Sequence, residues 1–109
     1  MPSSYKVLGQ AAPAATTDTN LYTVPTGASA VCSTLVIANR GTSGTVRVAV
    51  RPAGAALANQ HYLAYEIPVT QADSTYLTIG ITLAATDVVT VRASTADFSF
   101  SLFGTEVTA

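Results

Sequence analysis

The chain has few of the residues from which active sites are built. Its 109 residues include one His, one Cys, no Trp, and only five Lys or Arg and six Asp or Glu. Nucleophilic catalysis needs a base beside the nucleophile and a third group that orients the base, and His61 is the only imidazole. No Gly-x-Ser-x-Gly elbow, zinc-ligand cluster or EF-hand spacing accompanies it. We therefore expect a protein that is not an enzyme and that binds no cofactor and no metal.

The shortage of charge also limits the partners. Charged residues make up 10% of the chain and the net charge is −1, whereas an average soluble protein has about 25% charged residues. Nucleic-acid binding depends on clustered Lys and Arg. Arg47 and Arg51, on one predicted strand, are more typical of an edge protected against aggregation. Because a nearly neutral surface repels its neighbours weakly, we expect a protein that belongs to an assembly and has no nucleic-acid partner.

A lone cysteine and the absence of long apolar runs exclude further classes. Cys32 has no second cysteine with which to form an internal disulfide, and its apolar surroundings predict that it fills core space as a small hydrophobic residue. No window approaches the roughly 18 apolar residues of a membrane span. Residues 1–6 have no basic region followed by an apolar stretch. The sequence therefore predicts neither secretion nor a membrane partner.

What the chain does have is a rhythm of short runs in which apolar and small polar residues alternate. Each run ends at Gly, Pro, Asn or Asp, which is the pattern of an all-β sandwich or barrel. The predicted strands are residues 5–10, 21–24, 30–38, 45–51, 61–67, 74–83, 87–93 and 98–107. No helix is long enough for a crossover connection, so the strands should pair antiparallel in two packed sheets.

Details of the pattern predict how the strands are arranged. The run 30–38 is apolar or small on both faces and should be a central strand, with Cys32 on the face opposite Leu35 and Ile37. Residues 39–44 read as the turn of a hairpin that joins it to 45–51. We expect one domain over residues 1–109 with a jelly-roll-like topology and an extended N-terminal segment at about 1–20. The alternative, an immunoglobulin-like sandwich, lacks the usual Cys pair and buried Trp.

A few side chains are candidates for contact with a partner. Tyr62 and Phe103 each occur opposite the main apolar set of their strand, as an outward anchor at a protein interface would. Tyr5 and Lys6, in the N-terminal segment, and Arg51, at the end of a strand, complete the candidate set.

The order of the strand segments resembles a known class of protein. The segments are Tyr5-Lys6-Val7-Leu8-Gly9-Gln10, Leu21 to Pro25, Ser33 to Gly41, Arg47 to Val50 with Pro52 and Gly54, Leu77 to Leu83, and Phe98 to Gly104. With these segments the chain resembles the small virion structural proteins of tailed bacteriophages, over nearly its whole length.

The resemblance implies a part of the virion, at one of two positions. The first is a capsid decoration or cement protein, commonly a homotrimer, which is assembled in the host cytoplasm and binds the major capsid protein lattice on the capsid exterior. Residues 1–20 would then be an arm along a neighbouring subunit, and their removal (residues 1–18) should leave the sandwich folded. The second is a tail or tail-fibre component involved in attachment. A general β-sandwich adaptor for another partner is the remaining alternative.

Overall fold

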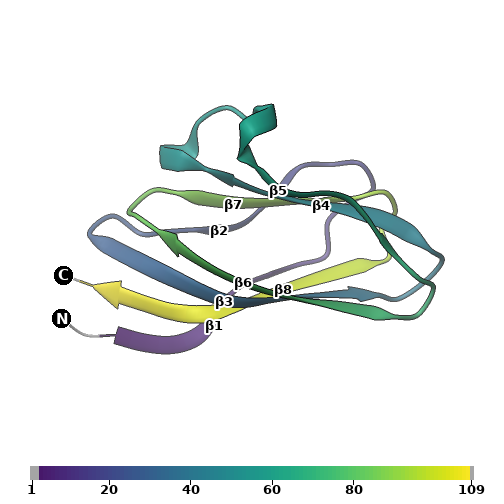
Figure 1. Cartoon of the computed structure of the whole chain (residues 1–109), viewed down its shortest axis with the longest axis horizontal. Coiled ribbons are helices and arrows are strands. Elements are labelled where there is room, and N and C mark those ends of the chain that lie inside the picture. The colour runs from purple at the N-terminus through teal and green to yellow at the C-terminus, as the bar shows by residue number, and fades with distance from the viewer. Residues whose placement is uncertain (1–2, 109) are drawn as a thin grey trace.

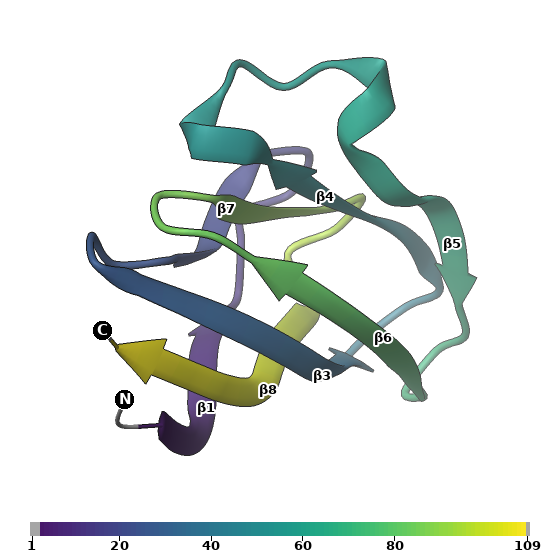
Figure 2. The same cartoon turned by 60° about the vertical axis from the view of Figure 1, so that its left-hand side comes forward.

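The computed structural model describes residues 3–108, which form two packed β-sheets with short connections. Within this range the strands are β1 (Ser3–Ala11), β2 (Thr19–Thr23), β3 (Ala28–Asn39), β4 (Gly44–Arg51), β5 (Tyr62–Val69), β6 (Ser74–Leu83), β7 (Val88–Ala93) and β8 (Phe98–Thr108). Two 3-10 turns, η1 (Pro52–Gly54) and η2 (Asn59–His61), lie between β4 and β5. Figure 2 shows this segment standing out beyond the sheet that contains both strands. Each of the eight predicted runs is a strand.

The order of the strands identifies the topology. The first sheet has the order β1-β8-β3-β6 and the second has the order β2-β7-β4-β5, and every pair is antiparallel (Figure 1). The first strand pairs with the eighth, the second with the seventh, the third with the sixth and the fourth with the fifth. A long antiparallel ribbon folded over on itself gives this pairing, which is the jelly roll. The fold-class prediction is confirmed, and the strand order excludes the immunoglobulin-like alternative.

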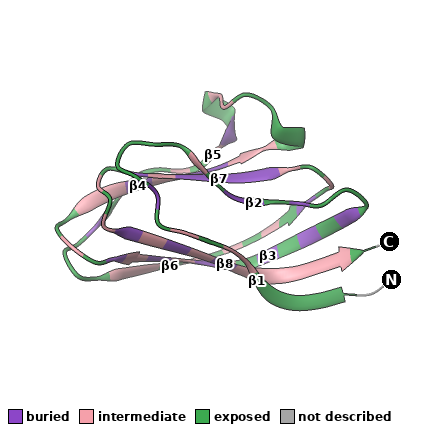
Figure 3. Cartoon of the chain, turned by 180° about the vertical axis from the view of Figure 1, so that it is seen from behind, coloured by how far each residue is buried: buried purple, intermediate pink, exposed green. Residues whose placement is uncertain are grey.

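The core lies between the two sheets and is filled by alternate residues of the inner strands. Figure 3 shows β7 almost wholly buried and most of β1 exposed. Cys32 is fully buried, as predicted, and burial raises the pKa of its thiol to about 11. Its neighbours in the core include Leu35, Ile37, Val46, Val48, Val89, Val91, Phe98, Phe100 and Leu102. Two layers of aliphatic and aromatic side chains therefore hold the sheets together.

The predicted hairpin at residues 39–44 is wrong. β3 belongs to the first sheet and β4 to the second, so this segment crosses between the sheets. Asn39, which is buried, fixes the crossing: its Nδ2 donates to the carbonyl oxygens of Thr42 at 2.8 Å and of Val69 and Thr70 at 3.2 Å. The error has a physical reason. Alternation shows which side chains are buried, but it does not show which strand lies alongside.

Bulges at the same level of the first sheet change which residues face the core. Between β3 and β8, Cys32 lies opposite Gly104 and Thr34 lies opposite Phe103, so Ser33 is the extra residue of a bulge. A bulge reverses the alternation beyond it. Cys32 therefore shares the inner face with Leu35 and Ile37, contrary to prediction.

The same register change recurs on both sides of this bulge. In β1, Val7 lies opposite Phe103 of β8 and Gly9 lies opposite Leu102, so Leu8 is the extra residue of a bulge. Ile81 of β6 lies opposite Cys32 of β3, and Thr78 lies opposite Thr34. Between these two pairs β6 has one residue more than β3, and Gly80 there has a positive φ of 52°. Three of the four strands thus carry an extra residue at one level, and bulges bend and twist the strands that contain them.

The N-terminal segment lies in the sheet of its own chain. β1 pairs with β8 from Ser3 to Ala11, and Leu8 and Ala11 pack against the core. Gly9 is pressed against the Leu21 carbonyl of β2, where a Cβ atom would overlap the backbone. The expectation that this segment is an arm along a neighbour is therefore corrected for residues 3–11, which form an edge strand of the sandwich.

Candidate functional site

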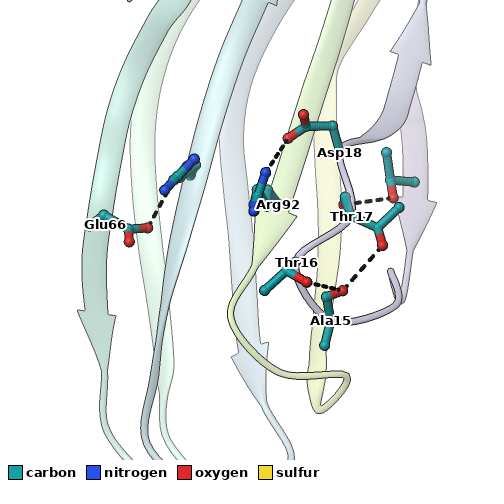
Figure 4. Close-up of polar contacts among 8 residues, drawn as sticks. Ala15, Thr16, Thr17, Asp18, Glu66 and Arg92 are labelled. Atoms are coloured by element: carbon teal, nitrogen blue, oxygen red, sulfur yellow. Dashed lines mark hydrogen bonds and ion pairs between the residues drawn. The ribbon is translucent and has the colours of Figure 1, made fainter.

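The two outer faces of the sandwich differ in charge. On the second sheet, Arg92 lies 3.8 Å from Asp18 and directly opposite Arg47 in the strand register, and Arg47 lies 3.0 Å from Glu66. These side chains form an ionic row across the sheet, in which two neighbouring arginines are flanked by a carboxylate on each side. Figure 4 shows the Arg92–Asp18 pair and the position of Glu66 on its own strand. The guanidinium of Arg47 holds the pKa of Glu66 below its usual range through a hydrogen bond.

In the part of the chain that the structure describes, no strand of the first sheet points a charged side chain away from the core, and Arg40 reaches this face only at its margin, where its Nε donates to Ser99 Oγ at 2.9 Å. We define this neutral face by the side chains whose strand position points them away from the core. They are Ser3, Tyr5, Val7 and Gln10 of β1, Ser99, Ser101, Phe103, Thr105 and Val107 of β8, Ser29, Val31, Ser33, Thr34, Val36 and Ala38 of β3, and Ser74, Tyr76, Thr78, Gly80 and Thr82 of β6.

Most of the exposed large apolar side chains gather on the neutral face. Tyr5 is 88% exposed, Tyr76 68%, Val7 47% and Val31 45%. The other exposed large hydrophobic residues in the described range, Leu63 and Tyr65, lie on β5 of the second sheet. Exposed apolar groups that are gathered on one face, with no charge among them, are typical of a surface that packs against another protein.

An open hollow of about 510 Å³ lies in the neutral face beside the bulges of β1 and β3. The Ser33 hydroxyl donates to the Phe103 carbonyl at 3.2 Å within it. Its walls are Tyr5, Lys6, Val7, Ser33, Phe103, Gly104 and Thr105. The hollow is therefore mostly apolar, with one basic side chain at its margin, and it suits an apolar side chain of a partner.

The structure brings three of the five predicted contact residues together. Tyr5, Lys6 and Phe103 line the hollow. Arg51 and Tyr62 lie in the second sheet instead. The reason is that the sequence pattern does not show which sheet a strand joins.

Arg51 and Tyr62 have partners within the chain. The Arg51 guanidinium donates to Asn20 Oδ1 at 2.8 Å, to Thr90 Oγ1 at 3.0 Å and to the Ala55 carbonyl at 3.0 Å, so it ties the η1 segment to the sheet. The Tyr62 ring meets Tyr65 edge-on with centroids 5.0 Å apart.

Val7, Val31 and Tyr76 are surface residues that the prediction missed. The alternation in 74–83 gave a signal for Tyr76, because it falls opposite the apolar set of its strand. Val7 and Val31 gave none, because the bulges that follow them are not visible in the pattern.

A polar cluster joins the two sheets at the margin of the hollow. Glu106 accepts a hydrogen bond from Lys6 Nζ at 2.8 Å and another from the Tyr22 hydroxyl at 2.6 Å. These two hydrogen bonds hold the pKa of Glu106 below its usual range, and the bond from Lys6 has the larger effect. Burial, with the hydrogen bond to Glu106, raises the pKa of Tyr22 above its usual range. The cluster thus keeps Glu106 ionised and Tyr22 protonated at neutral pH.

The neutral face has no match to guide its interpretation. No protein-family model matches the chain, and no curated protein matches it. Within residues 3–108 there is no group of three or more His, Cys, Asp or Glu placed to hold a metal ion. The single His61 is buried, and its Nδ1 accepts a hydrogen bond from the Ala58 amide at 3.0 Å. Among the described residues, no helix is long and apolar enough to cross a membrane. The neutral face is therefore the candidate functional site.

Proposed function

We propose that this chain is a non-enzymatic structural protein of a phage virion, a capsid decoration or cement protein that binds the major capsid protein lattice through its neutral face. The proposal follows the expectation that the strand segments resemble those of small phage virion proteins. The observation that supports it is that the jelly roll presents an outer face without charged strand side chains, on which Tyr5, Val7, Val31 and Tyr76 are exposed. The neutral face is the observation that carries the proposal.

The physical chemistry of this face favours permanent packing. Burying charged side chains costs several kcal/mol for each ion unless it is well paired, and the neutral face contains none. Burial of an exposed valine or aromatic side chain contributes about 1.5–3 kcal/mol, against the cost of lost translational and rotational freedom. Ser and Thr hydroxyls can exchange hydrogen bonds with water for hydrogen bonds with a partner. The surface is thus suited to shape and hydrogen bonding without salt bridges.

The second sheet then faces the solvent. Its ionic row of Asp18, Arg92, Arg47 and Glu66 keeps that face hydrated and discourages further stacking. A protein that binds only the mature lattice stabilises it by mass action, by about 2.7 kcal/mol at each site when its free concentration is a hundredfold above Kd. Summed over many sites, this resists the pressure of packaged DNA. The two faces of the sandwich therefore have separate roles in this proposal.

A matched pair of substitutions tests which face binds. Val31 is 45% exposed on the neutral face and Leu63 is 49% exposed on the second sheet. Val31→Glu is expected to weaken co-sedimentation with expanded capsids by at least about tenfold, because an unpaired carboxylate would be buried. Leu63→Glu should bind as the unchanged chain does and protect the capsids equally from heat. Equal binding by both variants would contradict the proposal.

The position of the chain in the particle separates the two virion alternatives. Cryo-electron microscopy of the particle that contains this chain is expected to show it at regular positions on the capsid shell. Density confined to the tail would replace the decoration role with that of a tail or fibre component.

A further inference from the structure

β6 is an edge strand that lacks the charge and proline that usually protect an edge against pairing with another strand. It is the last strand of the first sheet and pairs only with β3. Its ten residues, Ser74–Leu83, include no charged residue and no proline. In the described part of the chain, the backbone groups of residues 75–83 make no hydrogen bond outside the β3–β6 ladder. One side of β6 thus presents a row of free backbone donors and acceptors.

The other three edges are blocked. β1 carries Lys6 and is pressed against β2 at Gly9. β2 has only five residues and an irregular register. β5 contains Glu66, with a positive φ of 54°, Pro68 and two register shifts. Short length, charge, proline and bulges are the devices that keep edges from pairing. Only β6 is long, uncharged and free of proline, although Gly80 interrupts its regularity.

We propose that β6 pairs antiparallel with β6 of a second copy of this chain, which joins the two first sheets into one continuous eight-stranded sheet. A strand that pairs with itself about a two-fold axis places like residues near one another, so a charge in it would meet its own copy. β6 has no charge to repel its copy. A second copy fits this edge without any electrostatic cost.

The alternation of β6 selects the register of this pairing. Residues that pair across two strands point their side chains to the same face of the sheet. A β6 residue of the neutral face must therefore pair with a neutral-face residue of the other copy. An axis at Thr78 places Thr78 opposite Thr78, Tyr76 opposite Gly80, and Leu77 opposite Ile79. Thr–Thr and apolar cross-strand pairs are favourable. Gly80 has open space where a Cβ would lie, which the ring of Tyr76 from the other copy can cover.

This pairing goes beyond the proposed role on a capsid and does not depend on it. It makes the neutral faces of two copies one continuous surface. The symmetry is two-fold, whereas the resemblance to virion proteins implies a trimer, so a measured mass distinguishes the two.

The pairing is tested by placing a charge at Thr78, on the two-fold axis. The mass of each variant is measured by light scattering coupled to size-exclusion chromatography. The unchanged chain should have twice the 11.1 kDa mass of one chain. Thr78→Lys and Thr78→Glu should each have the single-chain mass, because like charges would face each other across the axis. An equal mixture of the two variants should recover the double mass. Ser29→Lys is the control, because Ser29 lies on the neutral face but on β3, and this variant should keep the double mass.

Three results would overturn the pairing. They are a single-chain mass for the unchanged protein, a threefold mass that charge at Thr78 does not alter, or a double mass that persists in both charged variants. Thr78 is exposed, so its substitution does not disturb the core. Far-ultraviolet circular dichroism of each variant checks that the sandwich is folded.

Discussion

At the scale of single residues, one polar cluster supplements the apolar contacts between the sheets. Glu106 is at its centre, because its carboxylate accepts hydrogen bonds from Lys6 of its own sheet and from Tyr22 of the other. Only 12% of the Glu106 side chain is exposed, whereas 46% of the Lys6 side chain is. A hydrogen bond to a charged group contributes more than a neutral one, but solvent screening at Lys6 reduces the gain.

The lowered pKa of Glu106 gives stability a defined dependence on pH. A carboxyl whose pKa is depressed by folding stabilises the fold above its unfolded pKa of about 4.3 and loses that contribution as pH falls through the folded pKa. Glu106→Gln should therefore lower the free energy of unfolding by about 1 kcal/mol at neutral pH. The difference from the unchanged chain should shrink at about pH 3. Urea denaturation at both pH values measures it, and an equal difference at the two values would contradict the assignment.

At the scale of elements, β1 is part of the fold and its contribution can be separated from that of its exposed side chains. Leu8 packs against the core, while Tyr5 on the same strand is 88% exposed. Leu8→Ala should lower the free energy of unfolding by about 2 kcal/mol, and Tyr5→Ala should change it by less than about 0.5 kcal/mol. Removal of residues 1–11 should abolish cooperative thermal unfolding. A truncated chain that unfolds at the original temperature would restore the arm interpretation.

The strands and their fold class could be predicted because alternation depends only on which side chains are buried. The position of each run and the central place of β3 follow from this pattern, whereas the strand order that separates a jelly roll from an immunoglobulin-like sandwich does not. Which side chains of a strand face the core could not be fully predicted, because the bulge at Ser33 reverses the alternation and places Cys32 on the same face as Leu35 and Ile37. The hairpin after Asn39 failed because sheet membership depends on long-range pairing.

The candidate site was partly visible for the same reasons. Phe103 was recognised from its place in the alternation and Tyr5 from its place in the N-terminal segment, and the fold brings them to one hollow. Tyr62 has the same signal as Phe103, and Arg51 was chosen at the end of a strand, but the fold puts both residues in the other sheet. The segregation of charge between the two sheets depends on strand order, which no local pattern contains.

At the scale of the whole molecule, this segregation predicts how attachment responds to salt. Charge pairs at an exposed interface weaken as ions screen them, with a Debye length of about 10 Å at 0.1 M and about 3 Å at 1 M. None of the side chains that define the neutral face is charged, and the two cations at its margin already have partners within the chain, Lys6 in Glu106 and Arg40 in Ser99 and the Ala96 carbonyl. Raising NaCl from about 0.1 M to about 1 M should therefore change the chain retained on sedimented particles by less than about twofold.

Sulfate strengthens the burial of apolar surface, so it should increase retention under the same conditions. The Val31→Glu chain provides the comparison, because its added carboxylate gives the face a charge that salt can screen. Release of the unchanged chain in moderate NaCl would show that charged groups hold it. The contact would then have to involve the second sheet, where Arg47 and Arg92 lie, and the pairing along the β6 edge would not be affected.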